Sequence, residues 1–95
     1  MVNELIYNMF NYMIVIGGYM FDLYILETCP YCKKVMSFLE EKNIKYNKIN
    51  ISDKAAEDAL IQAGGKRQVP FLVDRDRNIQ MYESYDIVEY LKTVI

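Results

Sequence analysis

The sequence predicts a single α/β domain whose elements follow the order β-α-β-α-β-β-α. Ninety-five residues, 53% of them hydrophobic, suffice for one domain with its own core. The hydrophobic periodicity alternates between strand and helix patterns, and turn-forming residues fall where the pattern changes. The predicted strands cover residues 20–26, about 45–51, 69–74 and 78–82, and the predicted helices cover residues 30–42, about 53–63 and 84–94.

The first strand and the first helix flank a Cys-Pro-Tyr-Cys tetrapeptide. Residues 20–26 (MFDLYIL) are mostly apolar, rich in β-forming residues and short, which predicts a buried strand. After the tetrapeptide, Val35, Met36 and Leu39 fall on one face of a helix. The two cysteines are therefore expected at the junction between a strand and a helix.

Capping and turn-forming residues mark the ends of the later helices and strands. Ser52-Asp53 can cap the second helix, and Gly64 and Gly65 can end it. Residues 74–78 (DRDRN) are typical of a polar turn between two short strands. The last helix has the apolar spacing of a helix that lies on a sheet, at Ile87, Val88 and Leu91.

Cys29 and Cys32 are the only cysteines of the chain, and their spacing fits either a redox dithiol or half of a zinc site. Structural zinc takes four Cys or His ligands, and the chain has no histidine and no third cysteine. A metal would therefore need carboxylates or a second copy of the protein. An inert buried pair or a structural disulfide is the other alternative, which the adjacent turn residues and helix start disfavour. We predict a redox pair and no metal.

The helix start explains why the two thiols should differ. Pro30 suits the first helical position because its φ is already set and its missing N–H would be unpaired there. This places Cys29 at the cap, where unpaired N–H groups and the positive end of the helix dipole favour an anion. We therefore expect the thiolate form of Cys29 to be favoured, and that of Cys32, one turn inside the helix, not to be.

A stabilised thiolate changes the steps of thiol-disulfide exchange unequally. The gain in thiolate population is largely offset by the lower nucleophilicity of a more stable thiolate. The same sulfur is, however, a better leaving group. We therefore expect the largest gain when a second thiol releases Cys29 from a mixed disulfide.

Three segments resemble the glutaredoxins, a family of small thiol-disulfide oxidoreductases. Residues 28–32 (TCPYC) are similar to the active site of dithiol glutaredoxins, and residues 64–70 (GGKRQVP) resemble the loop that ends in the family's Val-Pro. Residues 83–91 (ESYDIVEYL) resemble the start of the last helix in some glutaredoxins and in glutathione transferase amino-terminal domains. The resemblance covers about residues 20–93, so we expect a glutaredoxin-like domain over 20–95.

The resemblance implies a thioredoxin-like fold, a four-stranded mixed β-sheet flanked by helices, and a glutathione-dependent thiol-disulfide oxidoreductase. Cys29 would be the nucleophile that accepts the glutathionyl group, and Cys32 would be the resolving thiol for dithiol substrates. The implied substrates are protein disulfides and glutathionylated proteins. Glutathione would be a co-substrate, with no permanently bound cofactor.

The resemblance also implies a glutathione site. The backbone of Val69, before a cis Pro70 that faces the cysteines, would pair with the tripeptide as an added strand does. Ser84 and Tyr85 would meet the γ-glutamyl end, where helix N–H groups can hold its carboxylate. The implied binding residues are Tyr31, Gln68, Val69, Pro70, Ser84 and Tyr85, supported by Thr28, Pro30, Lys66 and Arg67.

Several of these residues also have a plain structural interpretation. Ser84 can cap its helix while it binds a ligand, because a helix N-terminus serves both roles. Tyr31 can be a surface aromatic and Pro70 an ordinary loop proline. Lys66 and Arg67 can be solvated loop charges.

The chain departs from the family pattern at three positions. Many glutaredoxins carry a lysine three residues before the first cysteine, and this chain has Leu26 there. Lys33, Lys66 and Arg67 are the available substitutes, and we expect the last two to border the glutathione groove. The other two departures, which bear on glutathione affinity, are Gln68, where the family often has Thr, and Glu83, where it often has Gly-Gly.

Charge and cysteine content restrict partners and compartment. A net charge of −2 gives no reason to expect nucleic acid or an anionic membrane as a partner. Two cysteines in one reactive pair, with none left for a disulfide framework, are typical of a reducing compartment. We therefore expect a cytoplasmic protein.

Residues 1–19 form an extension that the resemblance does not cover. Its apolar residues recur at helical spacing, which predicts a helix that covers an apolar surface on its own domain or on a second copy by self-association. The absence of a basic start and of a cleavage pattern disfavours a secretory signal, and its length excludes a membrane span. Alternatively, Met20 is the natural start. The apolar residues are Leu5, Ile6, Met9, Phe10, Met13 and Ile14.

Two functional alternatives remain open at this point. One is a thioredoxin-like reductase that receives electrons from a flavoprotein reductase and never meets glutathione, which the missing lysine favours. The other, by analogy with some family members, is a dimer that holds an iron-sulfur cluster through Cys29 of each subunit and two glutathione thiols.

Overall fold

The computed structural model describes residues 19–95, so all but the last residue of the predicted extension lies outside the described residues. The described elements follow the predicted order β-α-β-α-β-β-α. They are β2 (Phe21–Ile25), α1 (Pro30–Glu41), β3 (Asn47–Asn50), α2 (Lys54–Gly64), β4 (Phe71–Asp74), β5 (Ile79–Tyr82) and α3 (Ser84–Val94). None of these helices is long and apolar enough to cross a membrane.

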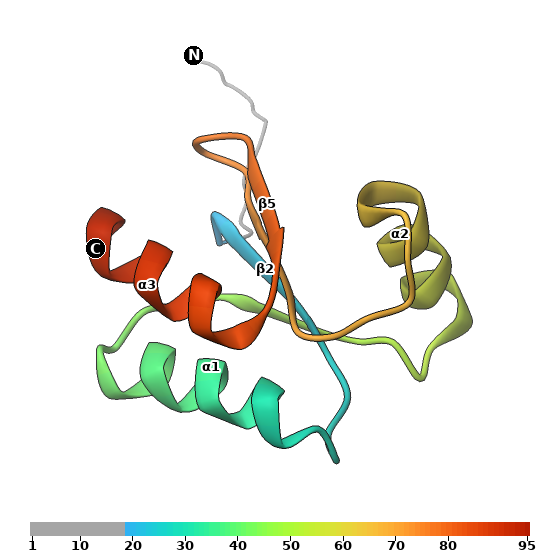
Figure 1. Cartoon of the computed structure of the whole chain (residues 1–95), viewed down its shortest axis with the longest axis horizontal. Helices are drawn as coiled ribbons and strands as arrows, with labels where there is room; N and C mark the ends of the chain where they lie inside the picture. The colour runs from blue at the N-terminus through green and yellow to red at the C-terminus, as the bar shows by residue number, and fades with distance from the viewer. Residues whose placement is uncertain (1–18) are drawn as a thin grey trace.

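The four strands form one mixed sheet in the order β3-β2-β4-β5. The central strand β2 runs parallel to β3 and antiparallel to β4, and β4 runs antiparallel to β5. Helices α1 and α3 lie side by side on one face of the sheet, and α2 lies on the other (Figure 1). This is the thioredoxin-like arrangement that the resemblance implied.

Alternation along β2 gives each face of the sheet its own hydrophobic cluster. Leu23 and Ile25 are fully buried in the cluster under α1 and α3, together with residues of both helices. Tyr24 points to the opposite face and packs with Ile51 and Leu60. Burial on both faces fixes the register of β2, because a slip by one residue would exchange the two sets.

The predicted boundaries move inward at several ends. Strand β4 begins at Phe71 and not at residue 69, because Pro70 has no N–H to donate to the ladder. Helix α2 begins after Asp53, whose side chain accepts the N–H of Ala56 at 3.2 Å, so the predicted cap is confirmed. It ends at a left-handed Gly65 with φ of 93°.

A buried carboxylate joins the predicted turn to the last helix. Asp74 is fully buried. Its Oδ2 accepts hydrogen bonds from the Tyr90 hydroxyl at 2.6 Å and from Arg77 Nη1 at 3.0 Å. The N–H groups of Asp76 and Arg77 donate to its other oxygen. Burial alone would raise the pKa of Asp74, but the bonds from Tyr90 and Arg77 outweigh that effect and hold it below its ordinary value.

We expect Asp74→Asn to lower the free energy of unfolding by about 2 kcal/mol or more at pH 7, because an amide cannot accept every bond that the carboxylate accepts. A lowered folded-state pKa means that this stabilisation is present above the unfolded-state pKa, about 4, and is lost as pH falls through the folded value. Urea titrations of both proteins between pH 7 and pH 2 should therefore converge in acid.

Asp76→Asn, an exposed change in the same turn, is the matched control and should stay within about 0.5 kcal/mol of the parent. A stability difference between Asp74→Asn and the parent that does not change with pH would show that the Asp74 charge contributes nothing.

Candidate functional site

Cys29 lies where the chain leaves β2 and enters α1. Its N–H donates to the carbonyl of Leu26 at 3.1 Å, which closes the turn after the strand. Its extended backbone, with φ −83° and ψ 114°, makes it the N-cap of α1, and Pro30 follows at the first helical position. The sulfur accepts the N–H of Cys32 at 3.2 Å. The predicted capping role of Cys29 is therefore confirmed.

The second thiol has a different environment. Cys32 is fully buried, whereas Cys29 is partly exposed. Burial, followed by a side-chain hydrogen bond to Cys29, raises the pKa of the Cys32 thiol to about 12. At neutral pH Cys32 is therefore protonated and buried, whereas the sulfur of Cys29 belongs to a partly exposed residue. Such a difference between the two thiols suits a pair in which one attacks the substrate and the other resolves the mixed disulfide.

We expect iodoacetamide at pH 7 to alkylate Cys29 alone in the folded protein. Burial raises the pKa of the Cys32 thiol far above neutrality, so this thiol stays protonated and unreactive at that pH. Mass spectrometry of the digested protein checks the site, and alkylation in urea is the control in which both cysteines should react. Equal labelling of the two thiols in the folded state would contradict the assigned asymmetry.

A groove of about 500 Å³ lies beside the dithiol. All six residues that the resemblance assigned to glutathione line it, and Glu83 joins them. The lining residues are Tyr31, Gln68, Val69, Pro70, Glu83, Ser84 and Tyr85. The groove therefore gathers residues from the start of α1, the loop before β4 and the start of α3.

The backbone of Val69, on one side of this groove, lies outside the hydrogen-bonded strands. The Val69-Pro70 peptide bond is cis, as the resemblance implied. Pairing of β4 with β2 begins only at Phe71, and within residues 19–95 no backbone hydrogen bond engages Val69. Its N–H and C=O are thus available to an extended peptide, which could add to the sheet as a strand does.

The start of α3 differs from the sequence-based interpretation. Glu83, with φ 75° and ψ 115°, is the N-cap of α3, and its side chain makes no capping bond. Ser84 is already helical, so its predicted capping role is wrong. Instead, Gln68 Nε2 donates to Glu83 Oε2 at 3.1 Å across the groove. A non-glycine residue with this φ is strained. Sequence reasoning treated Glu83 only as a departure from the family pattern, whereas the structure places it in the lining of the groove.

The two loop cations lie outside the lining of the groove. Lys66 Nζ lies 4.9 Å from the centroid of the Tyr82 ring. Arg67 forms an ion pair with Glu57 of α2. Of the other supporting residues, Thr28 is exposed in the turn before the cap, and Pro30 lines a second groove between α1 and α3.

Tyr82 of β5 fixes the position of the loop that carries the groove residues. Its hydroxyl donates to the carbonyl of Lys66 at 2.8 Å, and its ring packs on Phe71 with centroids 4.4 Å apart. Gly64 lies so close to this pair that an added Cβ would be 2.9 Å from Phe71 and would overlap the Tyr82 hydroxyl. Only glycine fits between the end of α2 and β5.

We expect Gly64→Ala to destabilise the fold by about 1 to 3 kcal/mol, because the added methyl group must displace a packed aromatic pair. Gly64 is the last residue of the helix, so the gain in helix propensity is less than the interior value of about 1 kcal/mol and offsets only part of this cost. Urea denaturation measures the change, and the exposed Gln62→Ala in the same helix turn is the control. An unchanged or increased stability of Gly64→Ala would show that the contact is not tight.

Within residues 19–95, no group of three or more His, Cys, Asp or Glu side chains is placed to hold a metal ion.

Comparison with known proteins defines the family. The profile of the glutathione S-transferase N-terminal domain matches residues 23–93. Glutaredoxin 1 of Rickettsia felis is 39% identical over 51 residues, which cover 50% of each chain. A glutaredoxin-like 8.6 kDa protein of Clostridium pasteurianum is 32% identical over 60 residues, which cover 63% of this chain and 80% of that one.

Comparison with solved structures also finds a glutaredoxin. Glutaredoxin 2 from Salmonella typhimurium, in complex with glutathione, is 29% identical with a TM-score of 0.67, over 81% of this chain and 34% of that one. The fold is therefore that of the thioredoxin-like proteins. The chain belongs to the family of glutathione S-transferase N-terminal domains and is a homologue of the glutaredoxins. It spans about half the length of the rickettsial glutaredoxin it matches.

Proposed function

We propose that this protein is a dithiol thiol-disulfide oxidoreductase that reduces protein disulfides and glutathione mixed disulfides. The observation that supports this most is the difference between the two thiols: Cys29 caps α1 and is partly exposed, whereas Cys32 is fully buried with a pKa of about 12. A nucleophile and a resolving thiol need this difference, and an inert structural pair does not.

The proposed reaction with a protein disulfide has two steps. The Cys29 thiolate attacks one substrate sulfur, the substrate S–S bond breaks, and the other sulfur leaves as a thiolate and takes a proton from water. Cys32 then loses its proton and attacks Cys29 Sγ, which releases the first substrate sulfur. The proton from Cys32 ends on the released substrate sulfur. The substrate thus gains two electrons, and the enzyme loses two electrons as its thiols form a Cys29–Cys32 disulfide. Two glutathione thiols reduce that disulfide and become glutathione disulfide.

The groove residues are suited to glutathione. The free backbone of Val69 can pair with the cysteinyl part of the tripeptide. The γ-glutamyl end carries a carboxylate, which suits the N-terminus of α3 at Ser84 and Tyr85, and an ammonium, which suits the Glu83 carboxylate. That a similar glutaredoxin was solved with glutathione supports this assignment. A reducing, cytoplasmic setting fits the two free thiols.

We expect Cys29→Ser to reduce every thiol-transfer activity to the background rate, because no other sulfur in the chain is both reachable and able to attack. Cys32→Ser should keep deglutathionylation, in which external glutathione releases the enzyme, and lose reduction of protein disulfides. Initial rates with a glutathionylated peptide and with a disulfide protein, in the presence of glutathione, measure both activities.

Two results would contradict the proposal. Retained activity of Cys29→Ser would show that the nucleophile is misassigned. Failure of glutathione alone to sustain turnover of the parent, with recovery when a flavoprotein reductase supplies electrons, would favour a thioredoxin-like donor over glutathione.

A further inference from the structure

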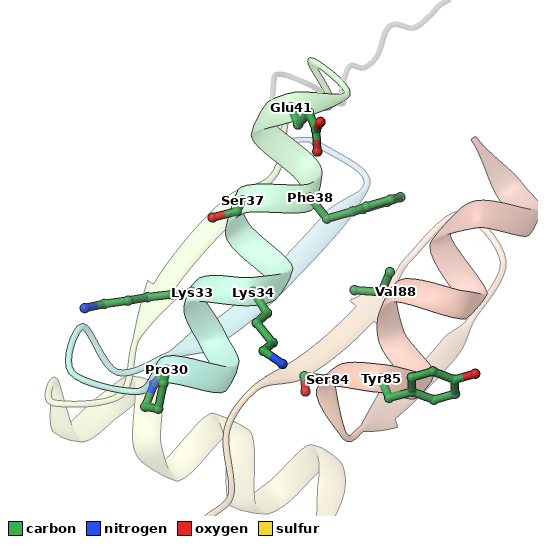
Figure 2. Close-up of a pocket in the computed structure, with 9 residues that line it drawn as sticks. All are labelled: Pro30, Lys33, Lys34, Ser37, Phe38, Glu41, Ser84, Tyr85 and Val88. Carbon is green, nitrogen blue, oxygen red and sulfur yellow. The ribbon is translucent and has the colours of Figure 1, made fainter.

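A second groove runs along the seam between α1 and α3 (Figure 2). It has a volume of about 580 Å³ and extends from Pro30 at the start of α1 to Glu41 at its end. Phe38 of α1 and Val88 of α3 face each other across it and supply apolar walls. Both side chains also pack against the buried cluster beneath, so these walls are held in place.

The two grooves meet at one point. Ser84 and Tyr85 line both the groove beside the dithiol and the groove between α1 and α3. In the proposed binding mode, the tripeptide glutathione ends at these two residues. A longer polypeptide that is joined to Cys29 and pairs with Val69 would continue past them into the second groove.

Two uncompensated cations lie at the same junction. Lys33 and Lys34 are exposed in the first turns of α1, and within residues 19–95 neither takes part in an ion pair, unlike Lys92, which pairs with Glu89. Both lysines line the groove, and in Figure 2 the Lys34 side chain reaches toward Ser84. An anion that enters the second groove from the dithiol side would meet Lys34 first.

We propose that the groove between α1 and α3 binds the polypeptide part of disulfide substrates, and that it selects segments with a carboxylate followed by an apolar side chain. The carboxylate is held by Lys34 and the apolar side chain lies between Phe38 and Val88. This inference rests on the proposed function and adds no chemical step to it. It assigns the substrate class: acidic, amphipathic protein segments beyond the reach of glutathione.

The test uses peptides that differ at one feature only. Each contains an intramolecular disulfide with the same pair of residues on both sides, read outward from each cysteine: Glu then Leu in the first peptide, Gln then Leu in the second and Glu then Ser in the third. Flanking on both sides makes the test independent of chain direction. The parent, K34E and the control K45E are assayed with glutathione at low ionic strength, and kcat/KM is measured for each peptide. Lys45 is exposed and lies outside the groove.

The parent should prefer Glu-Leu over Gln-Leu by about three- to fivefold, as expected for one exposed ion pair. It should also prefer Glu-Leu over Glu-Ser. The charge preference should be lost or reversed in K34E, which puts a repelling carboxylate in place of the cation, persist in K45E, and shrink in the parent at high salt. Each preference is a ratio within one protein, so a general loss of activity does not affect it.

Hydroxyethyl disulfide separates the two hypotheses, because it has no polypeptide to enter the groove. If the parent does not reduce it with glutathione, the proposed function fails and this inference fails with it. If the parent reduces it but shows no charge preference, or if K34E keeps the preference, only the inference is overturned. Equal loss of preference in K34E and K45E would likewise overturn it, because the effect would then come from net charge.

Discussion

The hydrogen bond from the Cys32 N–H to the Cys29 sulfur is the interaction on which the chemistry of this domain depends. It requires Cys29 to be the cap of α1 and Cys32 to lie one turn inside the helix, so a single local geometry assigns different environments to two chemically identical side chains. One sulfur accepts a helix N–H at the positive end of the helix dipole, and the core surrounds the other. No charged side chain is needed to distinguish them.

The rest of the fold holds this helix start in place. Val35 and Leu39 anchor α1 in the cluster on which α3 also rests, through Ile87 and Leu91. The two helices are therefore fixed relative to each other, and the second groove is a rigid gap between packed elements. On the other side of the sheet, contacts of Tyr82 position the loop that leads to the first groove.

Features that depend on local sequence could be predicted. The element order, the cap at Cys29 and the cap at Asp53 follow from periodicity and from side chains within four residues, and all three are confirmed. The residues that line the first groove could be named only through family resemblance, since they come from three separate parts of the chain. Their roles toward glutathione remain a proposal.

Features that depend on long-range contacts could not be predicted. Arg67 pairs with Glu57 of α2, and Lys66 lies over the ring of Tyr82 of β5. These partners come close to the loop only when α2 and β5 have packed in the folded domain. The cap of α3 shifts from Ser84 to Glu83 because the chain must turn sharply after β5. The groove between α1 and α3 likewise has no sequence signature, because it results from how two amphipathic helices are spaced.

Val69 packs against the hydrophobic clusters on both faces of the sheet. Within residues 19–95, its backbone also makes no hydrogen bond. Any strand-like partner that docks there is therefore coupled mechanically to both halves of the interior, and its affinity can be tuned by repacking either half. A protein engineer could loosen or tighten recognition from positions that never touch the bound molecule.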